Sequence, residues 1–301
     1  MAKIGKVRVP ATSANIGPGF DTFGIAFQLY NTVTLEEGDG GLEIIVNGEG
    51  AGDIPKDESN IVYKAIDHVL TKAGYEGRSL RIQLENGVPV ERGLGSSAAS
   101  ILGGVLAADD FLGRRFSRDL LLDWAVKIEG HPDNIAPALL GGMIISINDE
   151  HDKLYKKIAL PERLTAVAVV PEFKLSTKKS REILPEQVNF KDAVFNMRRA
   201  TIMMVALIEG DLALFGRMME DHLHHPFREV LVPGMSKVFA AAKKAGAFSV
   251  ALSGSGSTIL AFTEGEAGEI GGAMQAAFAG EGIESRVMVL KPDNVGAVLL
   301  K

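Results

Sequence analysis

Hydrophobic positions recur along the 301-residue chain with two periods, one typical of strands and one typical of helices. In the first half, apolar or alternating runs predict strands at residues 6–9, 23–35, 42–46, 80–84 and 143–147. Apolar positions three and four residues apart predict helices that begin near Asn60, Ser96 and Asp119. We expect Pro10 to end the first strand, and a glycine-rich turn at 37–41 to make 42–46 a returning strand.

The second half follows a simpler order of elements. Strands are predicted at 164–170, 248–252, 257–262 and 285–290, and helices at about 192–209, 211–222, 235–244 and 266–279. Strand, helices, strand, strand, helix, strand is the order of the split βαβ, ferredoxin-like plan. The polar segment 148–157 predicts a boundary between domains 1–155 and 156–301, so we expect an α+β fold with two domains.

Composition narrows the class of protein. Hydrophobic residues make up 46% of the chain and charged residues 23%, as in ordinary globular proteins. There is no apolar run of about 18 residues and no signal-peptide pattern at the start, so we expect no membrane span. The absence of cysteine excludes disulfides and thiolate metal sites and fits a cytoplasmic location. A net charge of −6 disfavours nucleic acid as a partner.

The segment 89–100 carries the clearest candidate chemistry. Gly93 and Gly95 precede Ser96 and Ser97, and a helical pattern follows at once. A helix N-terminus has unpaired N–H groups and a partial positive charge, so this loop is a candidate phosphate site. The chain has no Gly-Lys-Ser/Thr, which excludes a Walker loop, and the segment does not follow a strand directly, which disfavours a dinucleotide fingerprint. A tightly packed helix start is the alternative.

Two other segments concentrate polar residues. The loop 10–21 is rich in small residues and carries Asn15 and Asp21, which fits either a structured turn or a functional loop. The segment 129–134 contains Glu129, His131, Asp133 and Asn134. Its alternative interpretation is a helix-to-helix turn with Asp133 as N-cap.

A basic run and a histidine cluster have weaker signals. Residues 174–181 combine lysines, an arginine and hydroxyls, which fits a solvated loop or a site for a carboxylate or phosphate. The histidines at 222, 224 and 225 match no zinc spacing, which disfavours a metal site there. The glycine turn at 253–256 fits a hairpin or a close backbone approach to another loop.

Together, residues 10–21, 89–100 and 251–262 resemble the three signature motifs of the GHMP small-molecule kinases, in the family's order and spacing. Within that family, 10–21 and 131–138 resemble the homoserine kinase branch rather than mevalonate or galactose kinases, and Arg181 and Arg228 fit the same branch. The resemblance implies transfer of the γ-phosphate of ATP, with Mg²⁺, to the side-chain hydroxyl of L-homoserine, a step of threonine biosynthesis from aspartate. It also implies an N-terminal domain like ribosomal protein S5 domain 2, a ferredoxin-like C-terminal domain, and a homodimer.

The same resemblance assigns roles to residues of the nucleotide site. Asn60 would contact the adenine, and Ser97 and Glu129 would hold Mg²⁺. The loop would cradle the β- and γ-phosphates through Pro89, Val90, Glu91, Arg92, Gly93, Leu94, Gly95, Ser96, Ser97, Ala98 and Ala99.

For the acceptor, Arg181 and Arg228 would bind the carboxylate with Thr177 nearby, and Asp133 would bind the ammonium group. The reacting hydroxyl would be held by Asn15, Asp21 and Asn134, with His131 lining the pocket. We expect Asp21 and Asp133 to orient the acceptor and not to act as a strong base, because a loose transition state needs little early proton removal.

Three alternatives remain at this point. Another GHMP kinase, such as a mevalonate kinase, would not need both arginines in its site. A non-catalytic protein that keeps the nucleotide fold would lose Glu129 or the serines, and these are present. A dinucleotide-dependent oxidoreductase would need its glycine motif directly after a strand.

Overall fold

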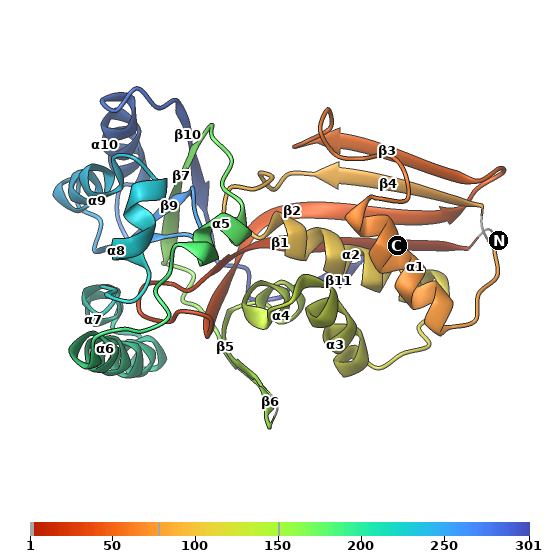
Figure 1. Cartoon of the computed structure of the whole chain (residues 1–301), viewed down its shortest axis with the longest axis horizontal. Helices are drawn as coiled ribbons and strands as arrows, with labels where there is room; N and C mark the ends of the chain where they lie inside the picture. The colour runs from red at the N-terminus through yellow and green to blue at the C-terminus, as the bar shows by residue number, and fades with distance from the viewer. Residues whose placement is uncertain (1–2, 78, 150) are drawn as a thin grey trace.

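Two β-sheets organise the part of the chain that the computed structural model describes, which is residues 3–77, 79–149 and 151–301. Figure 1 shows the first sheet with helices α1, α2, α3 and α4 on one face, and the second sheet beside it with α9 and α10 against it. None of the helices in the described part of the chain is long and apolar enough to cross a bilayer.

The first sheet combines long central strands with a short edge strand from the end of the chain. Its order is β11-β1-β2-β4-β3, and β5 pairs with the start of β2 and with β6. The strands are β1 (Ile4–Ala14), β2 (Phe23–Glu37), β3 (Leu42–Gly48), β4 (Leu80–Asn86), β5 (Met143–Asn148), β6 (Lys153–Ile158) and β11 (Val298–Leu299).

Helix α2 is the centre of the first half. Most of its side chains are buried between the sheet and the neighbouring helices, which fits its small and apolar composition. Asn60 caps α1, at the predicted helix start, and Ser117 caps α3, which begins at Arg118. The helices are α1 (Ile61–Lys72), α2 (Ser96–Phe111), α3 (Arg118–Glu129) and α4 (Pro132–Leu140).

The second sheet has the order β10-β7-β9-β8, with every neighbouring pair antiparallel. Numbered within this half, the order is fourth, first, third, second, which confirms the predicted ferredoxin-like plan. The strands are β7 (Thr165–Pro171), β8 (Ser249–Leu252), β9 (Ile259–Thr263) and β10 (Ser285–Leu290). The helices are α5 (Thr177–Glu182), α6 (Phe190–Glu209), α7 (Leu212–Arg217), α8 (His225–Arg228), a 3₁₀ turn η1 (Glu229–Leu231), α9 (Met235–Lys244) and α10 (Ala267–Ala279).

The prediction that Pro10 ends the first strand is wrong, because β1 continues to Ala14. The pairing of β1 with β2 shifts register between Pro10 and Ala11, which is a local bulge. On its other side β1 pairs with β11 only at Val7 and Arg8, so the missing N–H of Pro10 interrupts no described ladder there.

The prediction that 42–46 returns beside the second strand is also wrong. β4 lies between β2 and β3, and β3 runs parallel to β4 over its whole length. Parallel neighbours need a crossover connection, and α1 supplies it. The run 174–181 likewise differs from a plain loop, because α5 begins at Thr177 with Ser176 as its N-cap.

Most of the polar segment 148–157 belongs to the first sheet, through the end of β5 and through β6. β6 pairs with β5 along its full length and so belongs to the first sheet, although it is almost entirely exposed. Residues 155 and 156 both lie within β6, and the chain returns to the first sheet through β11. The domain boundary at 155 therefore stays a prediction. Along the chain, β6 of the first sheet ends at Ile158, and the next strand, β7, belongs to the second sheet.

A shared hydrophobic cluster joins the two halves. Ile16, Phe27 and Leu94 from the first half pack in one buried group with Met203 and Phe262 from the second. Burial of these side chains favours one relative position of the halves, because separating them would expose the apolar surface to water. The loops around this contact carry the three glycine-rich motifs.

Candidate active site

A cavity of about 540 Å³ lies between the two halves, and residues of all three motif segments line it. Its apolar lining comes from the loop before α1, the start of α1, β4 and the loop before α2, through Ile54, Pro55, Val62, Leu84 and Val90. Its charged lining includes Asp21, Asp53, Glu91, Glu129, His131, Asp133, Lys174, Arg181 and Arg228. The cavity therefore has an apolar part suited to a flat ring and a charged part suited to a small polar molecule.

The glycine-rich loop is fixed by its carbonyl oxygens. The Glu91 carbonyl accepts from Leu175 N at 3.1 Å, and the Arg92 carbonyl accepts from Thr258 N at 3.1 Å. The Gly93 carbonyl accepts from Ser253 Oγ at 2.6 Å, and the Leu94 carbonyl accepts from Thr12 N at 3.1 Å. These donors come from both of the other motif segments and from the loop before α5. Because the carbonyls are occupied by protein donors, the loop is held rigidly beside the N-terminus of α2.

Both motif glycines are required by geometry. Gly93 and Gly95 have φ angles of +79° and +70°, which side chains rarely adopt. A Cβ on Gly93 would lie 2.3 Å from the backbone carbonyl oxygen of Ser253, and a Cβ on Gly95 would lie 2.0 Å from Thr12 Oγ1. Gly95 is also the N-cap of α2 and has no side chain to bond the first-turn N–H groups, which leaves that end suited to an anion.

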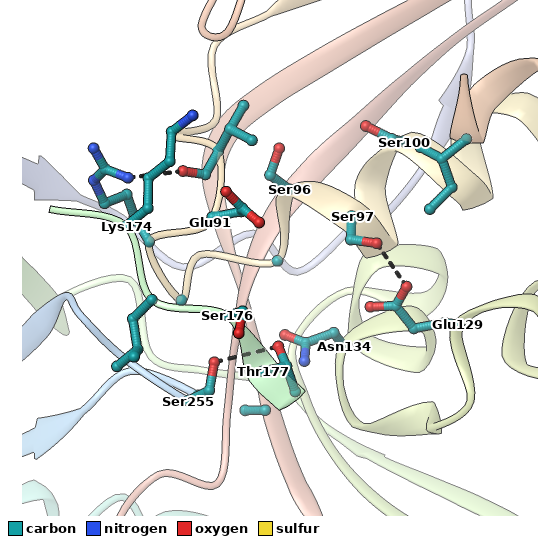
Figure 2. A pocket seen from close by; sticks show the side chains of 18 of the residues that line it. Glu91, Ser96, Ser97, Ser100, Glu129, Asn134, Lys174, Ser176, Thr177 and Ser255 are labelled. Carbon is teal, nitrogen blue, oxygen red and sulfur yellow. Dashed lines mark hydrogen bonds between the residues drawn. The ribbon is translucent and has the colours of Figure 1, made fainter. Parts of the chain in front are cut away.

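Ser97 and Glu129 meet at the side of this helix end. Ser97 Oγ donates to Glu129 Oε2 at 2.8 Å, as the dashed line in Figure 2 shows. Burial raises the pKa of the Glu129 carboxyl, and the hydrogen bond from Ser97 opposes that change. A hydroxyl and a carboxylate beside a phosphate site are the hard oxygen donors that Mg²⁺ prefers.

The two arginines differ in their surroundings. Arg181 makes a two-pronged ion pair with Asp21, Nη1 to Oδ2 at 2.9 Å and Nη2 to Oδ1 at 2.8 Å, and both side chains are partly exposed. Arg228 is buried, with 2% of its surface exposed. Burial lowers the pKa of Arg228 to about 10, with a further contribution from Arg181, so it remains charged at neutral pH. The ring of Phe20 lies beside both guanidinium groups.

The start of α4 supplies an acid, an imidazole and an amide. His131 Nδ1 lies 3.2 Å from Asp133 Oδ1, and this carboxylate raises the pKa of His131. Asn134 Nδ2 donates to Asp133 Oδ1 at 3.3 Å, and Thr12 Oγ1 donates to Asn134 Oδ1 at 2.9 Å. The N-cap of α4 is His131, so the alternative interpretation with Asp133 as N-cap is wrong; Asp133 lies within the first turn.

The cavity gathers most of the predicted site residues. Asn15, Asp21, Asn134, Thr177, Asn60, Glu91 and Ser96 line it along with those already described. Pro89, Leu94, Ala98 and Ala99 are buried and are not among its lining residues, so they support the loop from behind.

Some of the lining side chains are already used by the protein. Asn60 Oδ1 accepts from Val62 N at 2.8 Å as an N-cap, and its Nδ2 donates to the Pro55 carbonyl. Asn15 Nδ2 donates to the Gly254 carbonyl at 2.9 Å, and its Oδ1 accepts from Asp21 N at 3.0 Å. Their contacts with ligands stay predictions.

Arg92 has a similar structural use. Its Nε donates to the Pro171 carbonyl at 2.9 Å and its Nη1 to the Val90 carbonyl at 3.2 Å. The side chain thus ties the glycine-rich loop to the end of β7.

Sequence reasoning missed other residues of the cavity. Lys174 Nζ contacts Asp53 Oδ2 at 2.6 Å, which connects the two halves across the cavity. Ser255 Oγ lies 3.4 Å from Thr177 Oγ1, and Figure 2 shows this pair below the helix end. The basic run and the glycine turn were signals for Lys174 and Ser255, whereas Asp53 stands in a turn-rich loop with no motif around it.

Models of two domain families match the chain. "GHMP kinases N terminal domain" matches residues 60–142, and "GHMP kinases C terminal" matches residues 203–280. The chain belongs to the GHMP kinase family. The homoserine kinase of Moorella thermoacetica is 47% identical to it over 98% of this chain and 99% of that protein.

Solved structures of the family agree in fold. The homoserine kinase from Cytophaga hutchinsonii superposes with a TM-score of 0.90 at 34% identity, covering 100% of this chain and 98% of that one. The mevalonate kinase of L. major, solved with R-mevalonate, has a TM-score of 0.70 at 17% identity, covering 97% of this chain and 96% of that one. At that identity the mevalonate kinase shares the fold, and its substrate says nothing about this chain.

Proposed function

We propose that this GHMP kinase transfers the γ-phosphate of ATP to the side-chain hydroxyl of L-homoserine, forming O-phospho-L-homoserine in threonine biosynthesis. The observation that carries the proposal is that one cavity joins the glycine-rich loop and the Ser97–Glu129 pair to two arginines and a buried aspartate. A zwitterionic amino acid with a hydroxyl needs a cation, an anion and a nearby phosphoryl donor. The similarity to proteins named homoserine kinase supports the same substrate.

The nucleotide half of the site binds ATP by position and charge. The apolar lining from β4 and the α1 region suits the adenine, and the triphosphate follows the loop to the N-terminus of α2. Ser97 and Glu129 would hold Mg²⁺, which when bound neutralises charge on the transferring phosphate. Glu129 binds a cation only after losing its proton, so its raised pKa makes this half sensitive to acid.

The acceptor half orients homoserine against this phosphate. Arg181 already has Asp21 as a carboxylate partner, so we assign the substrate carboxylate chiefly to Arg228. Asp133 would bind the ammonium group. Asp21, Asn15 and Asn134 then hold the hydroxyl by hydrogen bonds, with Thr177 and His131 closing the pocket.

Proton transfer needs no strong base in this arrangement. The raised pKa of His131 favours its protonated form, which cannot accept a proton from the hydroxyl, and Asp133 is already engaged with His131 and Asn134. Phosphoryl transfer passes through a loose transition state, in which positioning and charge neutralisation supply most of the catalysis.

We also propose that the protein works as a homodimer, as the family resemblance implies. Support comes from α6, which exposes several large apolar side chains, among them Met197 and Ile208. A second copy would cover such a face. Light scattering of the purified protein tests this: a mass of one chain at working concentration would contradict it.

The function is tested by measuring ADP release with ATP and Mg²⁺ and three acceptors: L-homoserine, mevalonate and L-serine. We expect release with homoserine and little with the other two. Release with mevalonate alone would keep the phosphate site and overturn the acceptor assignments. Nucleotide binding without release for any acceptor would favour a non-catalytic member of the fold.

A further inference from the structure

His224 is a buried side chain in the connection between α7 and α8, directly behind the acceptor half of the cavity. None of its surface is exposed. Its Nε2 lies 2.9 Å from the carbonyl oxygen of Gly17, in the first motif loop, and its Nδ1 lies 3.3 Å from Arg228 Nη1. The ring therefore connects two parts of the site that are far apart in the chain, and neither the family resemblance nor the substrate chemistry requires it.

The partners of His224 determine its protonation. A carbonyl oxygen only accepts hydrogen bonds, so Nε2 must carry a proton. A guanidinium nitrogen only donates, so Nδ1 must have a free lone pair. Both conditions hold for one form of the ring, the neutral tautomer with its proton on Nε2. Burial lowers the pKa of His224 to about 4, in agreement with a neutral ring at physiological pH.

The donors of Arg228 divide into a structural set and a free set. Nε donates to the Ser180 carbonyl at 3.2 Å, and the two N–H groups of Nη1 are taken by the Gly254 carbonyl at 3.0 Å and by His224. Among the described residues no acceptor bonds Nη2. Because Arg228 lines the cavity, its remaining two N–H groups are available to a ligand there.

We propose that His224 is a positioning residue that fixes the guanidinium plane of Arg228 and thereby sets the preference of the site for acceptors that carry a carboxylate. The proposal rests on the proposed function, because it assigns the substrate carboxylate to Arg228. With the lone pair of His224 removed, one N–H of Nη1 would be buried without an acceptor, and the guanidinium would turn to satisfy it. Such a rotation would misalign Nη2 with the carboxylate.

The residues around His224 hold it in this role. Asp221 accepts hydrogen bonds from the backbone N–H groups of Leu223, His224 and His225, and from Asn196 Nδ2 at 2.6 Å. His225 Nε2 accepts from Leu252 N at 3.2 Å. One potential ligand atom from each of Asp221, His224 and His225 lies within 4.8 Å of the others, but hydrogen bonds already use both carboxylate oxygens of Asp221, both ring nitrogens of His224 and Nε2 of His225. We therefore assign this cluster to support of Arg228 and not to a metal.

Two substitutions separate the two contacts of His224. In His224→Asn, the side-chain amide lies near the place of Nδ1 and can still accept from Arg228, but the contact with Gly17 is lost. In His224→Gln, the longer amide reaches toward Gly17 and the acceptor for Arg228 is lost. Each enzyme is assayed with L-homoserine and with 3-aminopropan-1-ol, which has the same amine and hydroxyl but no carboxylate.

We expect His224→Gln to raise KM for homoserine about tenfold, corresponding to one lost hydrogen bond of about 1.4 kcal/mol, with kcat and KM for ATP within twofold of wild type. The activity of His224→Gln with 3-aminopropan-1-ol should equal that of wild type. The KM of His224→Asn for homoserine should lie close to the wild-type value. In an Arg228→Ala background, His224→Gln should add no further loss. The proposal would be overturned if His224→Gln lost as much activity with 3-aminopropan-1-ol as with homoserine. It would also be overturned if His224→Gln still raised the homoserine KM tenfold in the Arg228→Ala background.

A measurement on the unmodified protein keeps the inference falsifiable even where a variant does not fold. Nitrogen-15 NMR of the histidine rings in wild-type protein should show one ring neutral and protonated on Nε2 from pH 8 down to pH 5. A His224 ring that is protonated on Nδ1, or charged in this range, would contradict the link to Arg228. The NMR experiment uses no substrate. If wild-type protein fails to phosphorylate homoserine, the proposed function is wrong, but the NMR result still tests the hydrogen bond between His224 and Arg228.

Discussion

The nucleotide end and the acceptor end of the cavity are built in different ways. At the nucleotide end, a contiguous loop is held by its own carbonyl oxygens, and the side chains of Ser96 and Ser97 remain at the surface of the cavity. At the acceptor end, the Arg228 side chain is held by Ser180, His224 and Gly254, and His224 in turn contacts Gly17, which lies 207 positions away in the chain. The first end is a backbone structure and the second is a network of buried side chains.

This difference indicates where each property of the enzyme resides. A loop fixed mainly through its carbonyl oxygens depends little on the identity of its own side chains. A buried cation with three of its five N–H donors bonded to the protein has little freedom to turn, because an unsatisfied donor costs about 1–3 kcal/mol. We therefore expect phosphate transfer to depend on the first end and acceptor preference on the second.

The largest effect should come from removing the charge at the nucleotide end. Glu129→Gln keeps the shape of the side chain but removes the carboxylate beside Ser97. We expect kcat to fall on the order of 10²–10³-fold, as when one preorganised charge-stabilising group is lost, with the KM for homoserine little changed. Asp53→Asn, which changes a cavity carboxylate held by Lys174, is the matched control and should stay within threefold. Equal losses in both variants would contradict a specific role of Glu129.

A smaller effect should come from the contact between the two ends. A Cβ at Gly95 would meet Thr12 Oγ1, which donates to Asn134 at the acceptor end. We expect Gly95→Ala to lower the free energy of unfolding by about 2–4 kcal/mol, combining left-handed strain with the clash. Gly113→Ala is the control: its φ is +83°, but nothing lies within 4 Å of the new Cβ, so only the strain of about 1 kcal/mol applies. Urea unfolding measures the free energy of unfolding of both variants. If Gly95→Ala and Gly113→Ala lose the same amount, the contact with Thr12 Oγ1 adds no cost, which contradicts the prediction.

The smallest effect concerns pH and reports on the buried histidines behind the acceptor end. Burial lowers the pKa of His224 to about 4 and that of His225 to about 3, below the ordinary value near 6.5 that the unfolded chain would have. Between pH 6.5 and about 4 the unfolded chain therefore binds protons that the folded protein does not, so stability falls as pH falls. Each histidine contributes up to about 1.4 kcal/mol per pH unit.

Unfolding at pH 7 and pH 5 tests this pH dependence. We expect His224→Gln to lose less stability than wild type between the two values. His151→Gln, which changes an exposed histidine, should lose as much as wild type. An identical pH dependence in His224→Gln would mean that His224 is not held neutral in the folded protein.

The same contrast explains what sequence reasoning could predict. The glycine-rich loop, the helix start at Asn60 and the ferredoxin-like order were predicted because their signals are local: turn glycines, a capping side chain and periodic apolar residues. The cluster of His224 with Arg228 was not predicted, because no spacing in the chain reveals that His224 lies against Gly17. The ion pair of Arg181 with Asp21 was missed for the same reason, although both residues were assigned to the site.

The errors in the fold have a related cause. Ending the first strand at Pro10 applied a local rule, and whether a strand partner lies beside the proline is a tertiary fact. Pairing 42–46 with the second strand followed proximity in sequence, whereas β4 occupies that place after a helical crossover. The strand β6, within the polar segment 148–157, was not predicted because it is almost entirely exposed, and the domain boundary placed in that segment stays a prediction.

The separate construction of the two ends is tested most directly by calorimetric titration of Arg228→Ala with L-homoserine and, separately, with a non-hydrolysable ATP analogue in the presence of Mg²⁺. Loss of a charge-assisted contact of about 1.5–3 kcal/mol predicts that homoserine affinity falls about 10- to 100-fold, while nucleotide affinity stays within twofold of wild type. A comparable fall in nucleotide affinity, in protein shown to be folded by circular dichroism, or an unchanged affinity for homoserine would contradict the division of the cavity into two ends.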